Sequence, residues 1–296
     1  MANKKILVTG ANGQLGKSLH SIAAEYPSFD FTFAGRDSVA VDDAVSVSSA
    51  FAEVKPDFCV NAAAFTAVDK AETDNATARI VNGTAVGILA AACAAAGAKF
   101  IHVSTDYVFN GLSEVPYKED HPTDPVNQYG TSKLLGEALA LLKNPESVII
   151  RTAWVYSEYG NNFVKTMMRL MKERKEVGVV MDQIGAPTYA RDLAHAILDI
   201  ISGSEWVPGI YHYSNRGKIS WYEFAEAIKI KNGFDCVVKP ITTPEFPTPA
   251  KRPAFSLLDT SKISETFELR IPGWEESLDV CLGNLNSPSA AAEEGS

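Results

Sequence analysis

The sequence lacks the features that mark several large classes of protein. Its 296 residues include four cysteines, which lie far apart and form no CxxC pair, so the chain offers no zinc site or redox motif of that type. No apolar run approaches the roughly 20 residues that span a bilayer. Only three apolar residues precede Thr9 and Gly10 after the N-terminal lysines, too few for a signal peptide. We therefore expect a cytoplasmic protein without a membrane segment.

Basic residues are scarce relative to acidic ones. Lysine and arginine together number 27 against 36 acidic residues, which gives a net charge of −9. A general nucleic-acid binder would instead carry a basic stripe, so we expect no nucleic-acid partner. A small anionic ligand remains compatible with this composition, because a local site can be positive within a negative field.

The first half of the chain alternates short apolar runs with helical stretches. Runs rich in Val, Ile and Phe predict buried strands at residues 6–8, 29–33, 58–60, 100–103 and 148–150. Alanine-rich residues 86–96 favour a helix between them. Strands that alternate with helices pair in parallel through right-handed crossovers. We predict an α/β fold in which residues 1–152 form a doubly wound parallel sheet of the Rossmann type, the dinucleotide-binding domain.

The pattern loosens after Trp154. It predicts a helix at 161–175, a strand at 177–181 and a second helix at 189–201. Residues 239–252 are rich in Pro and Thr and predict an extended loop. We expect residues 153–286 to form mainly a smaller C-terminal α/β substrate-binding lobe, partly interleaved with the first domain. Residues 287–296 have little apolar surface to bury and predict a disordered tail.

The first predicted strand runs directly into a glycine-rich turn. Gly10, Gly13 and Gly16 are spaced three apart, and a helical pattern follows them. Glycines let the backbone approach a pyrophosphate closely, and the helix N-terminus offers free N–H groups. A plain strand-to-helix turn can contain the same triplet, but its position at the first strand of a βαβ series indicates a dinucleotide site.

The residues after the second predicted strand bear on which dinucleotide binds. An acidic residue there would bind the ribose 2′-hydroxyl of NAD, whereas this chain has Gly35 and Arg36. A guanidinium can form a bidentate pair with a 2′-phosphate, which favours NADPH, with NADH possible as an alternative cofactor. The competing interpretation is a solvated arginine neutralised by Asp37.

A third group of residues supplies hydroxyls and an amine. Thr105 ends the fourth predicted strand, at the edge where open α/β sheets bind ligands. Tyr129 and Lys133 lie four apart in a predicted helix and so share a face. An ammonium beside a phenol favours the phenolate, which predicts a Tyr129 pKa below its ordinary value. An isolated YxxxK pair is often only a surface Tyr and Lys, but here the three residues are candidate catalytic groups.

Together these residues resemble the extended short-chain dehydrogenases/reductases and, more narrowly, the dTDP-4-dehydrorhamnose reductase family. The narrower match rests on segments at 61–72, 104–109, 151–156, 160–163, 182–188 and 247–253, which have the order found in that family. The resemblance implies NADPH-dependent reduction of the 4-keto group of a sugar-nucleotide substrate, dTDP-4-dehydro-β-L-rhamnose, in the synthesis of nucleotide sugars for cell-surface polysaccharides.

The resemblance also implies roles for individual residues. Tyr129 would protonate the sugar oxygen, Lys133 would lower the Tyr129 pKa and bind the nicotinamide ribose, and Thr105 would bind the keto oxygen or tune Tyr129. Contacts with the dinucleotide would come from Gly13, Gln14, Leu15, Ala64, Phe65 and Thr66. Gly10, Gly16 and Ala63 are further candidates for binding the cofactor. Contacts with the sugar nucleotide would come from Thr66, Val68, Asp106 and Trp154.

Two of the substrate-side candidates have plain structural alternatives. Arg252 is a candidate for the substrate diphosphate, because its planar donors suit phosphate oxygens, and a solvated loop arginine is the alternative. For Trp154 the alternative is a core aromatic at the junction of the two domains.

The chain departs from the family pattern at three positions. Some relatives carry an acidic residue, used in a metal-bridged dimer contact, where this chain has Ser18. We therefore expect no metal and no metal-bridged dimer, and either a monomer or a homodimer. Ala40 stands where an aspartate near the adenine is frequent, with Asp42 and Asp43 close by. Phe65 stands where relatives commonly have a hydroxylated or imidazole side chain.

Two other functions fit parts of the pattern. Another extended-family sugar-nucleotide reductase or an epimerase would use the same scaffold, although an epimerase would need tightly held NAD, which Arg36 disfavours. A non-catalytic NADP-binding regulatory subunit is also compatible, because fold alone does not fix function. The use of Tyr129 and Lys133 discriminates between these hypotheses.

Overall fold

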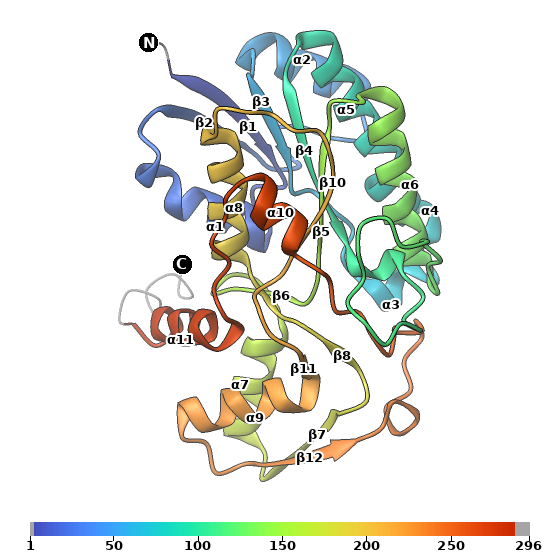
Figure 1. Cartoon of the computed structure of the whole chain (residues 1–296), viewed down its shortest axis with the longest axis vertical. Helices are drawn as coiled ribbons and strands as arrows, with labels where there is room; N and C mark the ends of the chain where they lie inside the picture. The colour runs from blue at the N-terminus through green and yellow to red at the C-terminus, as the bar shows by residue number, and fades with distance from the viewer. Residues whose placement is uncertain (1–2, 288–296) are drawn as a thin grey trace.

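The computed structural model describes residues 3–287 as a sheet layer with a smaller lobe beneath it (Figure 1). Six parallel strands form the sheet in the order β10-β5-β4-β3-β1-β2. Their bounds are β1 Lys4–Thr9, β2 Phe29–Ala34, β3 Phe58–Asn61, β4 Lys99–Thr105, β5 Val148–Thr152 and β10 Gly209–Tyr213. The predicted α/β class and parallel Rossmann-type sheet are confirmed.

Helices cover both faces of the sheet. One face packs against α1 (Gln14–Ile22) and α8 (Ala190–Ser202), whose apolar side chains share a core with β1 and β5. The opposite face packs against α2 (Ala44–Val54), α5 (Ala85–Ala96) and α6 (Gln128–Lys143). The sheet is therefore buried on both sides, which explains the nearly continuous apolar runs of its strands.

The sixth strand comes from the second half of the chain. β10 pairs in parallel with β5, and α8 packs on α1, so residues 190–213 belong to the sheet layer although they lie beyond residue 152. The sequence pattern predicts no strand at residues 209–213. Short α10 (Ser261–Thr266) also lies against β10.

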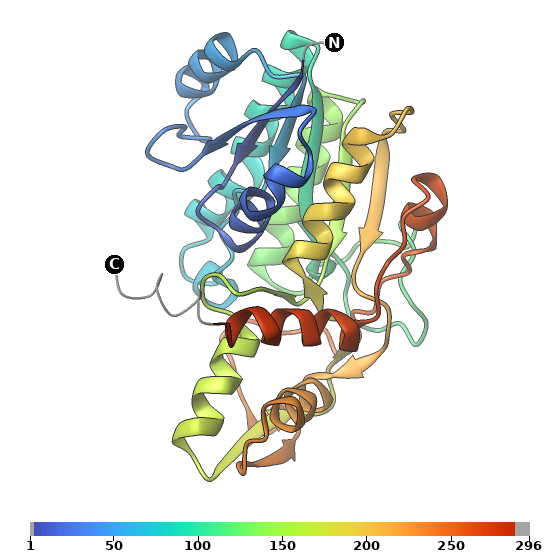
Figure 2. The same ribbon diagram turned by 90° about the vertical axis from the view of Figure 1, so that its left-hand side faces the viewer.

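The smaller lobe contains three two-stranded ladders and three longer helices. The ladders pair β7 (Glu176–Val180) with β12 (Val237–Ile241), β8 (Ile184–Gly185) with β11 (Ile219–Ser220), and β6 (Val155–Tyr156) with β9 (Thr188–Tyr189). The helices are α7 (Phe163–Glu173), α9 (Trp221–Asn232) and α11 (Trp274–Leu285). Figure 2 shows α11 lying across the junction between the sheet layer and the lobe.

The predicted loop at 239–252 is wrong at its start. Val237–Ile241 forms the edge strand β12, and Thr243–Glu245 forms a short 3₁₀ turn (η4). Pro240 is tolerated there because an edge strand does not need every N–H for its ladder. The predicted disorder of the C-terminal tail lies, except for Ser287, outside the described residues.

One helical stretch of the sheet layer is both long and apolar. Residues 75–96 comprise α4 (Asn75–Arg79), the π-helical turn η2 (Ile80–Thr84) and α5. By length and composition this stretch could cross a membrane, which the sequence analysis did not anticipate. Half of it is buried inside the fold, against α6 and α2, and the core helices of soluble proteins meet the same criterion.

Helix α6 lies very close to the segment that precedes α5. A Cβ on Gly136 would lie 2.1 Å from the carbonyl oxygen of Asn82, and one on Gly130 would lie 2.2 Å from that of Tyr107. No side chain fits at either place, so the two glycines determine how deeply α6 packs.

The Gly136→Ala substitution is therefore expected to destabilise the protein by ~1–3 kcal/mol, because the methyl group overlaps backbone atoms that cannot move freely. Gly283→Ala is the matched control, since Gly283 is also helical and a Cβ there meets nothing within 4 Å. The control should be neutral or stabilising by up to ~1 kcal/mol. Urea unfolding of both variants measures the difference, and equal stabilities would contradict this account of the packing.

Candidate active site

The glycine turn between β1 and α1 uses its three glycines differently. Gly10 has φ +75°, and a Cβ there would lie 2.4 Å from the backbone nitrogen of Ala63. A Cβ on Gly16 would lie 2.4 Å from the carbonyl oxygen of Gly10. Both are thus required by the packing of the turn itself. Gly13 meets no protein atom closer than 3.4 Å and begins α1 without a side-chain cap, so its bare backbone faces open space.

A cleft of about 420 Å³ opens beside this turn. Several predicted cofactor contacts line it together: Gly10, Gly13, Arg36, Ala63, Ala64 and Phe65. The unpaired N–H groups at the start of α1 and the Arg36 side chain suit the phosphates of a dinucleotide. The lining of the cleft thus offers donors of the kind that hold an NADP-type cofactor.

Three other residues of the turn lie away from this cleft. Leu15 is buried in the core, and Gly16 packs on Gly10. The Gln14 side chain contacts the lobe, where its oxygen accepts hydrogen bonds from Ser157 Oγ (2.9 Å) and Asn162 Nδ2 (3.0 Å). Gln14 thus connects the glycine turn to the lobe through its side chain.

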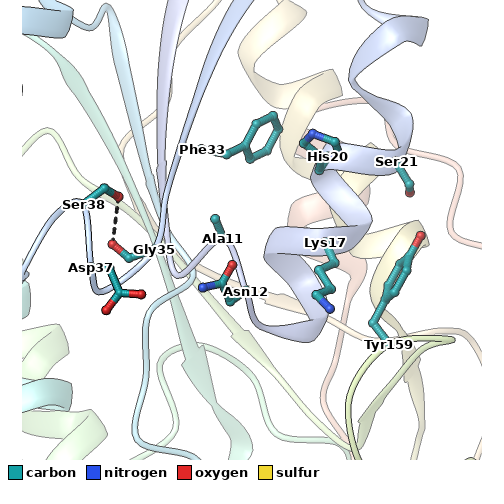
Figure 3. A pocket seen from close by; sticks show the side chains of 10 residues that line it. All are labelled: Ala11, Asn12, Lys17, His20, Ser21, Phe33, Gly35, Asp37, Ser38 and Tyr159. Carbon is teal, nitrogen blue, oxygen red and sulfur yellow. Dashed lines mark hydrogen bonds between the residues drawn. The ribbon is translucent and has the colours of Figure 1, made fainter. Parts of the chain in front are cut away.

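A second cavity lies on the other side of the glycine turn (Figure 3). Its lining includes Lys17, His20, Asp37 and Tyr159. Asn12 and Gly35 border both this cavity and the cleft, and a Cβ on Gly35 would lie 2.8 Å from Asn12 Nδ2. A larger residue at position 35 would therefore require the Asn12 side chain to shift.

The candidate catalytic residues meet at the carboxyl edge of the sheet. Thr105 ends β4 and is buried, and Tyr129 lies in the first turn of α6 with a hydrogen bond to Thr105. Burial and the nearby Asp106 raise the pKa of Tyr129 to about 12, although the contact with the Thr105 hydroxyl acts in the opposite direction. The predicted lowering of the Tyr129 pKa is therefore wrong. The phenol is protonated at neutral pH, which is the form that donates a proton.

Lys133 faces the sheet rather than the phenol. Its Nζ donates to the carbonyl oxygen of Val103 (2.6 Å) and lies 3.4 Å from His102 Nε2. Burial lowers the pKa of Lys133 to about 8, and the negative charge of Glu137 acts against this shift. These contacts explain why Lys133 does not lower the pKa of Tyr129.

Polar side chains that the sequence analysis did not identify hold α6 in place. Asn127 caps the helix by accepting from the N–H of Gly130 (2.7 Å), and Glu72 accepts from the N–H of Gln128 (2.8 Å). Buried Asn82 bonds both the N–H and the carbonyl of Phe65 and the hydroxyl of Ser132. An Asn just before a helical pattern is a recognisable N-cap signal, whereas nothing in the sequence indicates the contacts of Asn82.

Asp106 and Arg252 lie on the side of the lobe. Burial raises the pKa of Asp106 to about 6, against hydrogen bonds from Ser256 and Thr105. Arg252 forms a bidentate pair with Asp69, at 2.8 and 3.0 Å, and its hydrogen bond lowers the pKa of the Asp69 carboxyl. Arg252 is therefore no freely solvated loop side chain.

The lobe contains a cavity of about 540 Å³ that Arg252 helps to line, together with Tyr107 and Trp221. Trp154 stacks on Trp221 with ring centroids 3.7 Å apart and has φ +48°. Trp154 thus packs at the junction and also supports a wall of the cavity. The other predicted substrate contacts, Thr66 and Val68, lie in the exposed turn and at the start of α3 (Val68–Ala71), next to Asp69.

Comparison with known proteins agrees with this geometry. The family model described as RmlD substrate binding domain matches residues 4–287. The dTDP-4-dehydrorhamnose reductase of Burkholderia thailandensis is 41% identical over 96% of this chain and 99% of its own. This chain belongs to the dTDP-4-dehydrorhamnose reductase family.

Solved structures of the family have the same fold. The reductase of Clostridium acetobutylicum has a TM-score of 0.91 and 39% identity, covering 96% of this chain and 100% of its own. The reductase of Bacillus anthracis, solved in complex with NADP, has a TM-score of 0.92 and 38% identity, covering 95% and 99%.

The three departures from the family pattern have clear places in the structure. Ser18 is fully buried in α1, away from any surface contact. Asp42, rather than Ala40, lines the cleft. Phe65 also lines the cleft, and Asn82 holds its backbone. Within residues 3–287, no group of three or more His, Cys, Asp or Glu side chains is arranged to hold a metal ion.

Arg36→Ala is expected to weaken NADPH binding about 10- to 150-fold and NADH binding very little, because hydrogen bonds to a charged group contribute roughly 1.5–3 kcal/mol. Fluorescence titration with each dinucleotide measures both affinities. Arg169→Ala, at an exposed arginine of α7 paired with Glu173, is the control and should change neither. An unchanged preference in the Arg36 variant would mean that this side chain is merely solvated.

Proposed function

We propose that this protein reduces the 4-keto group of dTDP-4-dehydro-β-L-rhamnose with NADPH and forms dTDP-L-rhamnose for the biosynthesis of cell-surface polysaccharides. The proposal rests mainly on one observation. The protonated phenol of Tyr129 lies beside Thr105 at the sheet edge, and its ring packs against Tyr107, which lines the Arg252 cavity, with centroids 5.6 Å apart. The same helix is connected through Ser132 and Asn82 to Phe65, which lines the dinucleotide cleft. Membership of the reductase family supports the choice of substrate.

The residues of the cleft determine how the cofactor is held. The backbone of Gly13 and the start of α1 would bind the diphosphate, Arg36 the 2′-phosphate, and Ala63 to Phe65 the adjacent wall. When bound, NADPH supplies the hydride that reduces the ketone. A relative of 38% identity was solved with NADP, which supports this choice of cofactor.

Tyr129 acts as the general acid. Its Oη transfers a proton to the C4 oxygen of the sugar as negative charge develops there, and Thr105 orients the phenol through their hydrogen bond. With a pKa of about 12, Tyr129 carries this proton throughout the neutral range. Lys133 would hold the nicotinamide ribose.

The lobe binds the sugar nucleotide in our proposal. Arg252, aligned by Asp69, offers guanidinium donors to the diphosphate, and Asp106 and Trp154 would contact the sugar, with Thr66 and Val68 nearby. We further propose that the enzyme acts in the cytoplasm as a monomer or homodimer without a bridging metal, which the buried position of Ser18 supports.

The alternatives receive less support. An epimerase holding NAD would leave Arg36 without a 2′-phosphate, and the relatives from Burkholderia thailandensis, Clostridium acetobutylicum and Bacillus anthracis are named as reductases. A regulatory subunit would have no use for Thr105, Tyr129 and Lys133 grouped at the carboxyl edge of the sheet.

The direct test of this function is a spectrophotometric assay. Purified protein is mixed with NADPH and enzymatically generated dTDP-4-dehydrorhamnose, and the absorbance of the reduced nicotinamide is followed. The expected result is a loss of absorbance that requires both compounds. No turnover by protein that binds NADPH normally would overturn the proposal and favour another keto sugar or the regulatory role.

Tyr129→Phe should lower turnover by about 10²–10⁴, the usual contribution of a positioned acid, and leave NADPH affinity nearly unchanged. Steady-state kinetics and a binding titration measure the two effects. Tyr26→Phe is the control, because the Tyr26 hydroxyl bonds Asp199 far from the cleft and should not affect turnover. Full activity in the Tyr129 variant would remove this residue from the role of proton donor.

A further inference from the structure

A row of buried polar side chains crosses the carboxyl end of the sheet beneath the candidate active site. Thr9, Asn61 and His102 occupy register-matched positions on β1, β3 and β4, so each is the direct cross-strand neighbour of the next. Lys133 of α6 completes the row. The exposed fractions of these four residues are 0%, 2%, 0% and 1%, so water does not satisfy their polar groups.

The hydrogen bonds fix the orientation of the Asn61 amide. Asn61 Oδ1 accepts from Thr9 Oγ1 (2.8 Å) and from the N–H of Ala63 (3.1 Å). A backbone N–H can only donate, so the amide cannot be flipped without placing two donors against each other. The Nδ2 group must therefore point at His102 Nδ1, which lies 3.1 Å away.

The amide in turn fixes the tautomer of His102. Because Nδ2 donates, His102 Nδ1 must accept, and a neutral imidazole then carries its proton on Nε2. The ring is neutral because burial, the larger cause, holds the pKa of His102 well below its usual value even when Lys133 carries no charge. Nε2–H lies 3.4 Å from Lys133 Nζ. An ammonium has no lone pair to accept this hydrogen, whereas a neutral amine has one.

We propose that Asn61 holds His102 as the Nε2–H tautomer, and that His102 is thereby a positioning residue that stabilises the neutral amine form of Lys133. The amine can donate one hydrogen to the carbonyl oxygen of Val103 and accept one from His102 Nε2–H, so both contacts of Nζ become hydrogen bonds. The role follows from the register of three strands, and His102 itself lies outside the segments that carry the family resemblance.

The consequence for the reaction rests on the proposed function. After Tyr129 gives its proton to the sugar oxygen, the phenolate must regain a proton. The Lys133 ammonium, which bonds Val103 and does not contact the phenol, supplies this proton through an intervening hydroxyl group and is left as a neutral amine. His102 Nε2–H donates to the lone pair of that amine and so favours the transfer. The amine then recovers a proton from solvent water, so one solvent proton is consumed for each ketone reduced.

Besides His102, other titratable or polar groups lie on the elements that pack around Lys133. On α6, Tyr129 lies one turn before it and Glu137 one turn after it. Glu137 favours the ammonium, but its carboxylate is paired with Arg151 of β5 at 2.7 and 2.9 Å. The segment before α5 presents the uncharged amide of Asn82 to this helix. Burial shifts the pKa of Lys133 in the same direction as His102 does.

The tautomer can be measured without any turnover. Nitrogen NMR of protein with isotope-labelled histidine separates protonated from unprotonated ring nitrogens. We expect His102 to carry its proton on Nε2. His212 is an internal reference, because its Nδ1 lies 3.0 Å from the carbonyl oxygen of Tyr117 and so must be the protonated nitrogen. A protonated Nδ1 on His102 in the unmodified protein would overturn the proposal, whether or not the enzyme reduces the expected sugar.

The Asn61→Asp variant is expected to exchange the protonated and unprotonated nitrogens of the His102 ring. A carboxylate can accept from Thr9, from Ala63 and from His102, so the ring proton should move to Nδ1 and Nε2 should accept from the Lys133 ammonium. The alkaline limb of the pH profile of turnover, which reports loss of the ammonium, should move upward by ~1 pH unit. His212→Gln, at a buried histidine that contacts Arg151 instead, is the control and should leave the limb in place.

The two readouts separate the possible failures. A limb that stays in place or moves down in Asn61→Asp, while the ring tautomer changes, would contradict the coupling of His102 to Lys133. If the alkaline limb moved equally in the His212→Gln variant, the shift would reflect a general change in the core. That result would also contradict the coupling of His102 to Lys133. If the protein lacks the proposed reductase activity, direct NMR titration of the Lys133 amine in both variants gives the same comparison.

Discussion

The packing of α6 against the sheet is the constraint on which the rest of the site depends. Two glycines, at 130 and 136, let the helix backbone touch the carbonyl oxygens of Tyr107 and Asn82, where no Cβ would fit. This depth of packing brings Tyr129 to Thr105 and inserts Lys133 among buried strand residues. A helix held even slightly further out would lose both contacts, because α6 carries both side chains.

Buried charge reinforces the same helix. Glu137 accepts from Arg151 of β5 at 2.7 and 2.9 Å and from Ser104 of β4 at 2.5 Å, with both ion-pair partners almost inaccessible to solvent. Such a pair costs desolvation energy, so its value lies in the unique geometry that it imposes on α6, β4 and β5. The pair also keeps the carboxylate of Glu137 occupied, which leaves Lys133 to interact mainly with His102 and Val103.

Local patterns in the sequence predicted the parts of the fold that depend on local properties. The strands β1 to β5, the glycine turn and the adjacency of Tyr129 and Lys133 follow from period, composition and spacing. The strand β10 was missed because its partner β5 lies far away in the sequence and its residues, Gly-Ile-Tyr-His-Tyr, form no pronounced apolar run. The pairing of Arg252 with Asp69 joins residues that no spacing rule connects.

The predicted pKa of Tyr129 failed for a related reason. Helical spacing placed Lys133 on the correct face, but it could not show that the amine turns to Val103 and His102 instead of the phenol. Burial then dominates the electrostatics of Tyr129. Contacts such as those of Asn82 and His102 arise from strand register and helix depth, which only the folded structure provides.

The most direct test of the central claim follows the hydride itself. NADPH carrying deuterium at the transferable position of the nicotinamide is incubated with the protein and dTDP-4-dehydrorhamnose, and the sugar product is examined by NMR and mass spectrometry. The account predicts one deuterium per product molecule, located at C4 of the sugar. A product without deuterium at C4, or deuterium at another carbon, would contradict the assignment of this site as a 4-ketosugar reductase.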